Sequence, residues 1–436
     1  MPRSPRWSKA VAPAALAVLL SGAAGVAAQG QDQAPNEAQA AAFDRVAEET
    51  AMLRELPIDA EIVEVFLSRE GLAERLPRDM EEDYPAAEAE ADSRAWAAFG
   101  LIPPGTDLRR LYTDLLAEQV AGFYDPETNE MFVIGGEFGA LEEFTYSHEV
   151  VHALQDQHLG LDELIDVDPA EVSDDEGLAT TSLFEGDATV ASLEYVLANP
   201  ALAARIAGSA LVDQPDTPVL NASPAVLALW LMFPYLGGQP FVEAIRAEGG
   251  WAAVDAAYAD PPVSSEQILH PEKYLERDEP TPVALLDLAP TLGAGWEIVD
   301  ENNLGEFQVA IMLANLQPGQ GLNAMTGAIA LPDAASAAAA GWDGDWYQLW
   351  GNGDREVLAW RSVWDGEEDA VAFADALRAY DEGRFGGTFA GETPQSLALA
   401  TADRAARIER VGNEVTYVLA PDAELAEQTM AALRGA

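Results

Sequence analysis

The sequence predicts an α+β protein: a mainly helical part with a small β-hairpin, followed by a small α+β domain. Two patterns support this prediction. Apolar residues recur at helical spacing in most segments between residues 37 and 259, interrupted by one pair of short β-rich runs at 122–134. From about residue 280, strand-like and helix-like runs follow in the order ββαββα.

Composition limits the possible functions. The chain has 436 residues, 75 of them acidic against 23 Lys and Arg, which gives a formal charge of −52. Such a surface repels polyanions, so we expect no nucleic-acid partner. Adaptation to high salt and a high-GC coding bias explain the acidity equally well. There is no cysteine, which excludes a disulfide framework and a thiolate zinc site. Any zinc must therefore be held by His, Asp or Glu.

Residues 1–28 have the pattern of an export signal. Arg3, Arg6 and Lys9 precede an apolar run at 10–20, and small residues at 26–28 predict cleavage after Ala28. An uncleaved N-terminal membrane anchor is the alternative. No other stretch looks apolar enough to span a membrane, so we expect a secreted mature form that is not membrane-embedded.

An N-terminal helical region is expected at 29–118. Helices are predicted over 37–56, 70–94 and 107–120, with Asp107 as the N-cap of the last, and a short helix or strand over 60–67.

The middle region, 119–280, begins with the hairpin, whose strands are 122–124 and 131–134. A helix is predicted over 140–159, ending at Gly160 in the left-handed conformation. An acidic loop at 162–176 and a second helix at 178–197 follow. Further helices are expected at 225–233, 241–247 and 252–259.

The C-terminal domain, 281–436, should contain strands at 346–350 and 356–364, a helix at 367–380, strands at 407–411 and 414–419, and a helix at 423–433. It has no histidine and no clustered motif, so no catalytic role is expected for it.

The predicted helix over 140–159 carries the pattern HExxH. His148 and His152 are one turn apart on one face, so two neutral imidazoles can bind one zinc ion. Glu149 is rotated by about 100° from His148, which places it beside the metal. It can act as the base that takes a proton from a metal-activated water.

Two residues compete to be the third ligand. His158 follows His148 by ten residues, but on a continuing helix it would lie about 15 Å away along the axis. Gln155 favours that continuation. Glu185, in the second helix, is flanked by apolar residues and by Gly186, which would let a neighbouring helix approach closely. We favour Glu185 as the ligand, with Asp187 supporting or capping rather than binding the metal.

The segment 264–275 holds the fourth histidine, His270, and Tyr274. Either side chain could donate a hydrogen bond to the oxyanion that forms during hydrolysis at zinc, and we name both as candidate catalytic residues. Tyr274 and Tyr146 are weaker candidates than His270, and a purely structural role is the alternative for each.

The sequence HEVVH with a downstream Glu resembles the gluzincin group of zinc metallopeptidases. The segments GFYDPETNEMFVI, HEVVHALQDQH, LFEGDAT and SSEQILHPEKYL are similar, more narrowly, to a family of exported, largely uncharacterised bacterial HExxH proteins. The resemblance implies a zincin-like catalytic core over 119–280, with His148, His152 and Glu185 on zinc and Glu149 as base. It also implies that the hairpin offers an edge strand to a peptide substrate.

One position departs from this pattern. Thermolysin-like members carry Asp four residues after the ligand Glu, where this chain has Thr189. The departure removes the residue that supports the ligands in those members, whereas Glu149 and the three ligands are present. We expect a zinc peptidase that acts on peptide or protein substrates. The alternatives are a non-catalytic, zinc-stabilised extracellular binding protein and a metallohydrolase that acts on a non-peptide amide.

Overall fold

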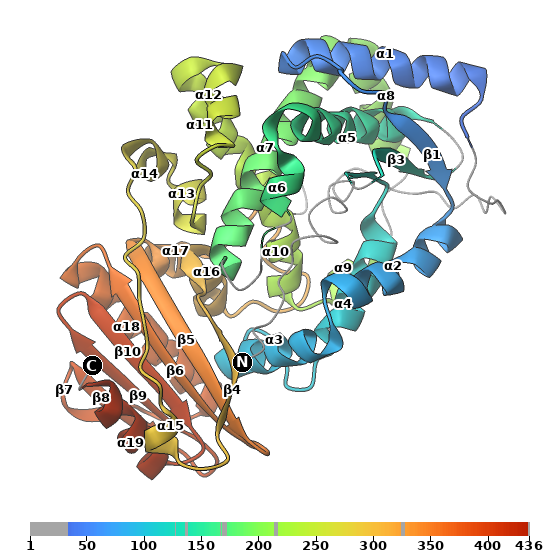
Figure 1. Cartoon of the computed structure of the whole chain (residues 1–436). Coiled ribbons are helices and arrows are strands. Elements are labelled where there is room, and N and C mark those ends of the chain that lie inside the picture. Colours follow the sequence, from blue (N-terminus) through green and yellow to red (C-terminus); the bar gives the residue numbers. More distant parts are fainter. Residues whose placement is uncertain are drawn as a thin grey trace.

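The computed structural model describes residues 34–434, except 127, 136–137, 166, 168–171, 213–216 and 324–327. The described chain is an α+β protein in which a large helical part carries a three-stranded sheet and a seven-stranded sheet lies at one end (Figure 1). The predicted fold class is confirmed. The predicted export signal lies outside the described residues.

The N-terminal helices follow the capping signals in the sequence. α1 (Glu37–Arg54) begins at Asn36, whose side chain accepts hydrogen bonds from two backbone amides of the first turn. The single helix predicted over 70–94 is wrong: α2 (Arg69–Asp83) and α3 (Ala86–Phe99) are separate, because Pro85 has no amide hydrogen to continue α2. α4 (Leu108–Gln119) begins at Asp107, as predicted.

Four helices form the centre of the helical part: α5 (Ala140–Leu159), α7 (Asp174–Ala198), α10 (Ala225–Leu236) and α11 (Gly238–Gly249). Gly160 ends α5 with φ 71°, which confirms the predicted cap. The acidic loop predicted at 162–176 is wrong at both ends. α6 (Leu161–Ile165) occupies its start, and α7 begins inside it because Ser173 caps the first turn.

Five other helices of the described chain surround this centre. They are α8 (Pro200–Val212), α9 (Pro218–Ala222), α12 (Trp251–Ala257), α13 (Ser265–Leu269) and α14 (Pro271–Glu276).

The smaller sheet has the strand order β1-β3-β2. β2 (Gly122–Asp125) and β3 (Glu130–Ile134) pair antiparallel, so the hairpin prediction is confirmed. β1 (Val63–Leu67) pairs parallel with β3, with Val63 opposite Glu130. β2 is therefore an edge strand, and it lies against α5.

The larger sheet is antiparallel and has the order β4-β5-β6-β10-β9-β8-β7. The strands are β4 (Glu297–Asn302), β5 (Trp342–Asn352), β6 (Arg355–Trp364), β7 (Ala390–Thr393), β8 (Ser396–Ala400), β9 (Ala405–Val411) and β10 (Glu414–Ala420). The ββαββα prediction corresponds to β5, β6, α18 (Glu367–Phe385), β9, β10 and α19 (Ala423–Leu433). It missed β4, β7 and β8.

Each face of the larger sheet packs on helices. Leu358 and Trp360 of β6 lie in a core with α18, α16 (Gly305–Ala314) and α17 (Asp333–Ala339), whereas the alternate residues Val357 and Ala359 lie in a core with α19 and α15 (Ala289–Leu292). Phe99 of α3 also joins the first core, with its ring 5.3 Å from that of Trp360. A helix expected in the N-terminal region thus helps to form the C-terminal core.

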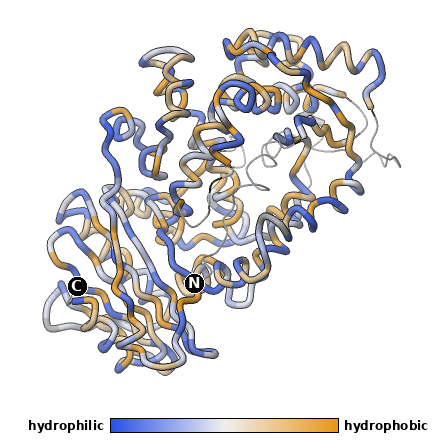
Figure 2. Tube along the Cα trace, viewed as in Figure 1, coloured by the Kyte–Doolittle hydropathy of each residue, from blue (hydrophilic) through white to orange (hydrophobic). Residues whose placement is uncertain are grey.

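One helical stretch among the described residues, Ala225–Gly249, is long and apolar enough to cross a membrane by length and composition alone. The expectation that no stretch beyond residue 28 is so apolar is therefore wrong. Hydrophobic residues run along α10 (Figure 2), and 78% of the most apolar window of this stretch is buried inside the protein. Its apolar residues form part of the core between α7 and α16.

Candidate metal centre

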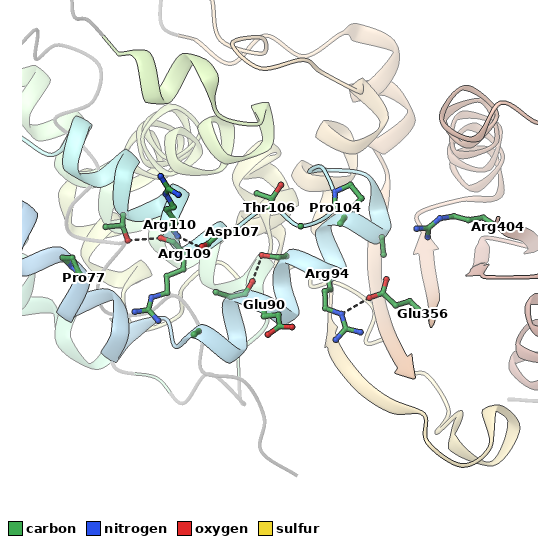
Figure 3. A pocket seen from close by; sticks show the side chains of 17 residues that line it. Pro77, Glu90, Arg94, Pro104, Thr106, Asp107, Arg109, Arg110, Glu356 and Arg404 are labelled. Carbon is green, nitrogen blue, oxygen red and sulfur yellow. Dashed lines mark hydrogen bonds and ion pairs between the residues drawn. The ribbon is translucent and has the colours of Figure 1, made fainter. Parts of the chain in front are cut away.

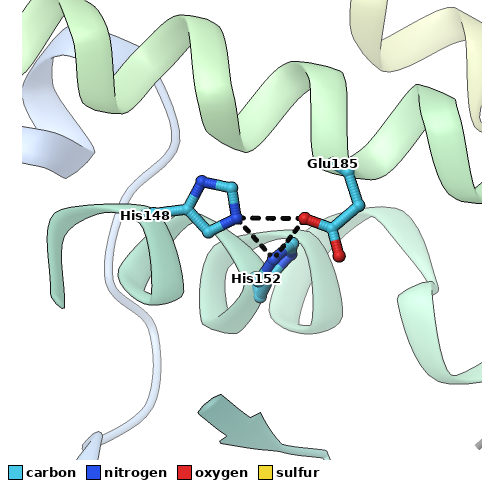
Figure 4. Close-up of side chains that lie close together, drawn as sticks. All are labelled: His148, His152 and Glu185. Atoms are coloured by element: carbon cyan, nitrogen blue, oxygen red, sulfur yellow. Dashed lines mark hydrogen bonds and ion pairs between the residues drawn. The ribbon is translucent and has the colours of Figure 1, made fainter. Parts of the chain in front are cut away.

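α5 carries the HExxH residues to the contact between α5 and α7. Val150, Ala153 and Leu154 of α5 pack in the core that includes α1. His148 and His152 project instead toward α7, where Glu185 meets them (Figure 4). The helical spacing thus divides α5 into an apolar side and a side that carries ligands.

The three side chains converge closely enough to share one ion. His148 Nε2 lies 3.0 Å from Glu185 Oε2 and 3.1 Å from His152 Nε2, and His152 Nε2 lies 3.3 Å from Glu185 Oε2. Two ligand atoms bound tetrahedrally to zinc, at about 2.0–2.1 Å each, are about 3.3 Å apart. The donor set and its spacing therefore fit a zinc ion held by two imidazoles and one carboxylate.

Burial supports the same interpretation. His148 and Glu185 are fully buried, and Glu185 Oε1 has no hydrogen-bond partner among the described residues. An ionised carboxylate is costly to bury unless a cation balances it. A metal ion between the three side chains would supply that balance.

The electrostatics of the ligands are those of a tightly coupled group. Burial lowers the pKa of His148 to about 4, so its imidazole is neutral. Burial acts in the same direction on His152, but the Glu185 carboxylate outweighs it and raises the pKa of His152 to about 9. Burial alone would raise the pKa of Glu185, but the two histidines lower it. Glu185 is therefore held as a carboxylate, the form that binds metal.

Glu149 lies beside the ligands and faces the edge strand β2. The backbone N–H of Tyr124 donates to Glu149 Oε2 at 3.1 Å, and Glu149 Oε1 has no partner in the described part of the chain. Burial raises the pKa of Glu149 to about 8. A buried carboxylate with one free oxygen, next to a metal site, is placed as a base would be.

A chain of hydrogen bonds supports His152 from behind. Gln155 Oε1 lies 2.8 Å from His152 Nδ1, and Gln155 Nε2 donates to Asp187 Oδ2 at 3.1 Å. Because the amide oxygen can only accept, Nδ1 carries a hydrogen, so Nε2 is the nitrogen that binds a metal once its own proton is released. Asp187 also accepts from Arg54 of α1, at 2.6 and 3.0 Å, and from Tyr258 at 2.8 Å. The support expected from a residue at the position of Thr189 comes from Gln155 and Asp187 instead.

The close crossing of α7 and α11 depends on two glycines. A Cβ atom on Gly186 would lie 2.3 Å from the carbonyl oxygen of Gly238, and one on Gly238 would lie 2.1 Å from that of Ser182. Glu185 directly precedes this crossing, so the helix contact fixes its backbone. The predicted close approach at Gly186 is confirmed.

The other sequence candidates lie in different surroundings. His158 Nε2 contacts the carbonyl oxygen of Pro57 at 2.6 Å, and this residue is not part of the ligand cluster. His270 pairs with Glu306 of α16 at 3.1 Å. The hydroxyl of Tyr274 donates to the carbonyl of Asp260, and that of Tyr146 donates to Glu64. Within the described residues, none of these contacts reaches His148, His152 or Glu185, so the geometry gives an oxyanion role no support.

Three contributors to the site were missed. Arg54 and Gln155 were not expected to support the ligands, and Tyr235 of α10 has its ring centre 6.0 Å from that of His148. A weak signal for Tyr235 exists in the sequence, because it is the one residue of AVLALWLMFPYL that carries a hydroxyl. The pairing of Arg54 with Asp187 has no local signal.

Comparison with known proteins covers only the C-terminal part. The model of a family described as a domain of unknown function (DUF8575) matches residues 294–430, which run from β4 into α19. The candidate metal centre lies outside this match. No curated protein and no solved structure matches the chain.

Proposed function

We propose that the protein is an exported zinc-dependent peptidase that hydrolyses peptide bonds. The observation that carries the proposal is the convergence of His148, His152 and Glu185 on one buried point, with Glu149 beside it. A purely structural zinc site closes its fourth position with another protein ligand. Among the described residues the cluster has three members, which leaves a position for substrate or water.

The residues around the cluster have complementary roles in this proposal. A zinc ion, when bound, would polarise the scissile carbonyl and acidify the attacking water. Glu149 accepts the proton of that water, because its Oε1 atom has no hydrogen-bond partner among the described residues. Gln155 holds His152 in one tautomer, and Tyr124 N–H orients Glu149.

The sheet supplies a place for the substrate. β2 is an edge strand, and the backbone N–H of Tyr124 points from it toward Glu149. An extended peptide that adds to this edge would place its backbone beside the base. A peptide is therefore favoured over a non-peptide amide as the substrate.

Zinc content separates the ligand assignment from its alternative. The purified protein should bind one zinc ion, Glu185→Gln should lose most of it, and His158→Ala should retain it. Circular dichroism checks that each variant is folded. Zinc loss in His158→Ala with retention in Glu185→Gln would overturn the assignment.

Hydrolysis of a quenched-fluorescent peptide library tests the reaction itself. Glu149→Gln should retain zinc and lose activity by about 10²–10⁴-fold, the usual contribution of a general base. Unchanged hydrolysis in Glu149→Gln would contradict the mechanism. Zinc binding without any cleavage of peptides or amides would favour a non-catalytic binding protein.

A further inference from the structure

A second site, separate from the metal ligands, lies where the helical part meets the larger sheet. A cavity of about 700 Å³ opens between α3, the start of α4, the start of β6 and the turn between β8 and β9 (Figure 3). This volume is within the range of pockets that bind small molecules, about 300–1,000 Å³. None of the residues that line it belongs to the candidate metal centre.

The pocket lining has more basic than acidic residues, whereas the chain as a whole has more acidic ones. Acidic residues outnumber Lys and Arg by 75 to 23 overall. The pocket lining contains four arginines and only three carboxylates; the arginines are Arg94, Arg109, Arg110 and Arg404. Most of the acidic surface would repel an anion. The guanidinium groups gathered here would instead attract one, so the pocket favours an anionic ligand.

Two of these arginines are already paired. Arg94 Nε contacts Glu356 Oε1 at 2.8 Å, and Arg109 pairs with Glu81. Arg110 is 78% exposed and lies 3.6 Å from Asp114, a weak contact in water. Arg110 is therefore only loosely engaged.

Arg404 is the available cation. It is half-buried and lines the pocket, and within the described residues its guanidinium has no hydrogen bond or ion pair. Its backbone holds the turn instead: its carbonyl accepts from the N–H of Thr401 at 2.8 Å, and its N–H donates to Thr401 Oγ1 at 3.2 Å. The turn is therefore held by the backbone of Arg404, and its guanidinium group is left available for a ligand.

The remaining walls suit the rest of a small ligand. Alanines of α3 and prolines of neighbouring segments are among the lining residues. Their small apolar side chains leave room for the uncharged part of a ligand. The N-terminus of α4 is already capped, because Asp107 Oδ1 accepts from the backbone N–H of Arg110 at 3.0 Å, so the charge for the ligand must come from the arginines.

We infer that this pocket binds a small anion, with a carboxylate or phosphate group on Arg404 and the body of the ligand along α3. Residues 294–430, the part that matches the domain of unknown function, supply Arg404 and Glu356, and the helical part supplies the other arginines. The ligand would therefore touch both parts of the protein at once.

Isothermal titration calorimetry on the full protein with inorganic phosphate, glutarate and the peptide acetyl-Ala-Ala-Glu tests this inference. At least one probe should bind with 1:1 stoichiometry, and added NaCl should weaken it. Arg404→Ala should weaken that binding about tenfold, since it removes a hydrogen-bonded charge. Glu356→Gln should strengthen it, because this change releases Arg94 from its present partner.

The control is Arg378→Ala, which removes an arginine of α18 outside the pocket and should leave binding unchanged. Binding of phosphate alone identifies a phosphate site, and binding of glutarate or the peptide identifies a carboxylate site. Saturable binding of none of the three probes would overturn the inference, as would binding that Arg404→Ala does not change.

Discussion

Gly186→Ala should separate the two helices that hold the third ligand in place. The new Cβ would lie 2.3, 2.4 and 2.8 Å from the O, C and Cα atoms of Gly238, whereas ordinary contacts begin at 3.4 Å. All three neighbours are backbone atoms, so no side chain can rotate away. α7 and α11 must therefore move apart by about 1 Å.

The size of the effect follows from two opposing terms. Overpacking a tight contact costs about 1–3 kcal/mol, and backbone atoms place this case at the upper end. Alanine is better than glycine in a helix interior by about 1 kcal/mol. The net destabilisation is about 2 kcal/mol.

Gly177→Ala is the matched control in the same helix. A Cβ atom on Gly177 meets nothing within 4 Å, so this variant keeps the gain in helix propensity without the clash. We expect the two variants to differ by about 3 kcal/mol in the free energy of unfolding, measured by urea denaturation of the metal-free protein. Zinc affinity should fall in Gly186→Ala alone. Equal stability of the two variants would refute the reasoning.

Three further changes test other parts of the structure. Gln155→Leu removes the acceptor for His152 Nδ1 and should lower zinc affinity about 10–100-fold in a chelator competition, and an unchanged affinity would exclude this support. Arg54→Met leaves Asp187 without its buried cation and should cost about 3–5 kcal/mol in urea denaturation, and a loss below about 1 kcal/mol would contradict it. Burial raises the pKa of Asp381 to about 6, so from about pH 4 to pH 6 the folded state keeps a proton that the unfolded state releases. Stability is therefore lost as the pH rises through this window, by about 3 kcal/mol in full. Asp381→Asn should match the parent near pH 4 and melt at a higher temperature at pH 8, and a constant difference between the two melting temperatures would exclude the effect.

The parts of the site that sequence could predict depend on local rules. The spacing of His148 and His152 works only on a helix, and the predicted helix ends at Gly160 as its C-cap requires. Glu185 could be predicted as a ligand because a carboxylate between apolar residues needs a cation. The close approach of two helices at Gly186 could be predicted because glycine has no side chain to keep them apart. Each of these predictions used only residues that are close in the sequence.

The parts that were missed depend on distant partners. Arg54 and Asp187 are 133 residues apart, and nothing near either residue indicates the other. The sequence of β1 fitted a helix and a strand equally well. It is a strand because it pairs with β3, which lies more than 60 residues further along the chain. β7 and β8 are four and five residues long and lie at the end of the larger sheet, so their periodic signal is short.

The position of Arg54 has a consequence for proteolytic maturation. Removal of residues 37–99 would expose the carboxylate of Asp187, take β1 from its sheet and pull Phe99 out of the C-terminal core. We therefore expect residues 37–99 to be retained in the mature protein, where Arg54 stabilises the surroundings of the metal centre.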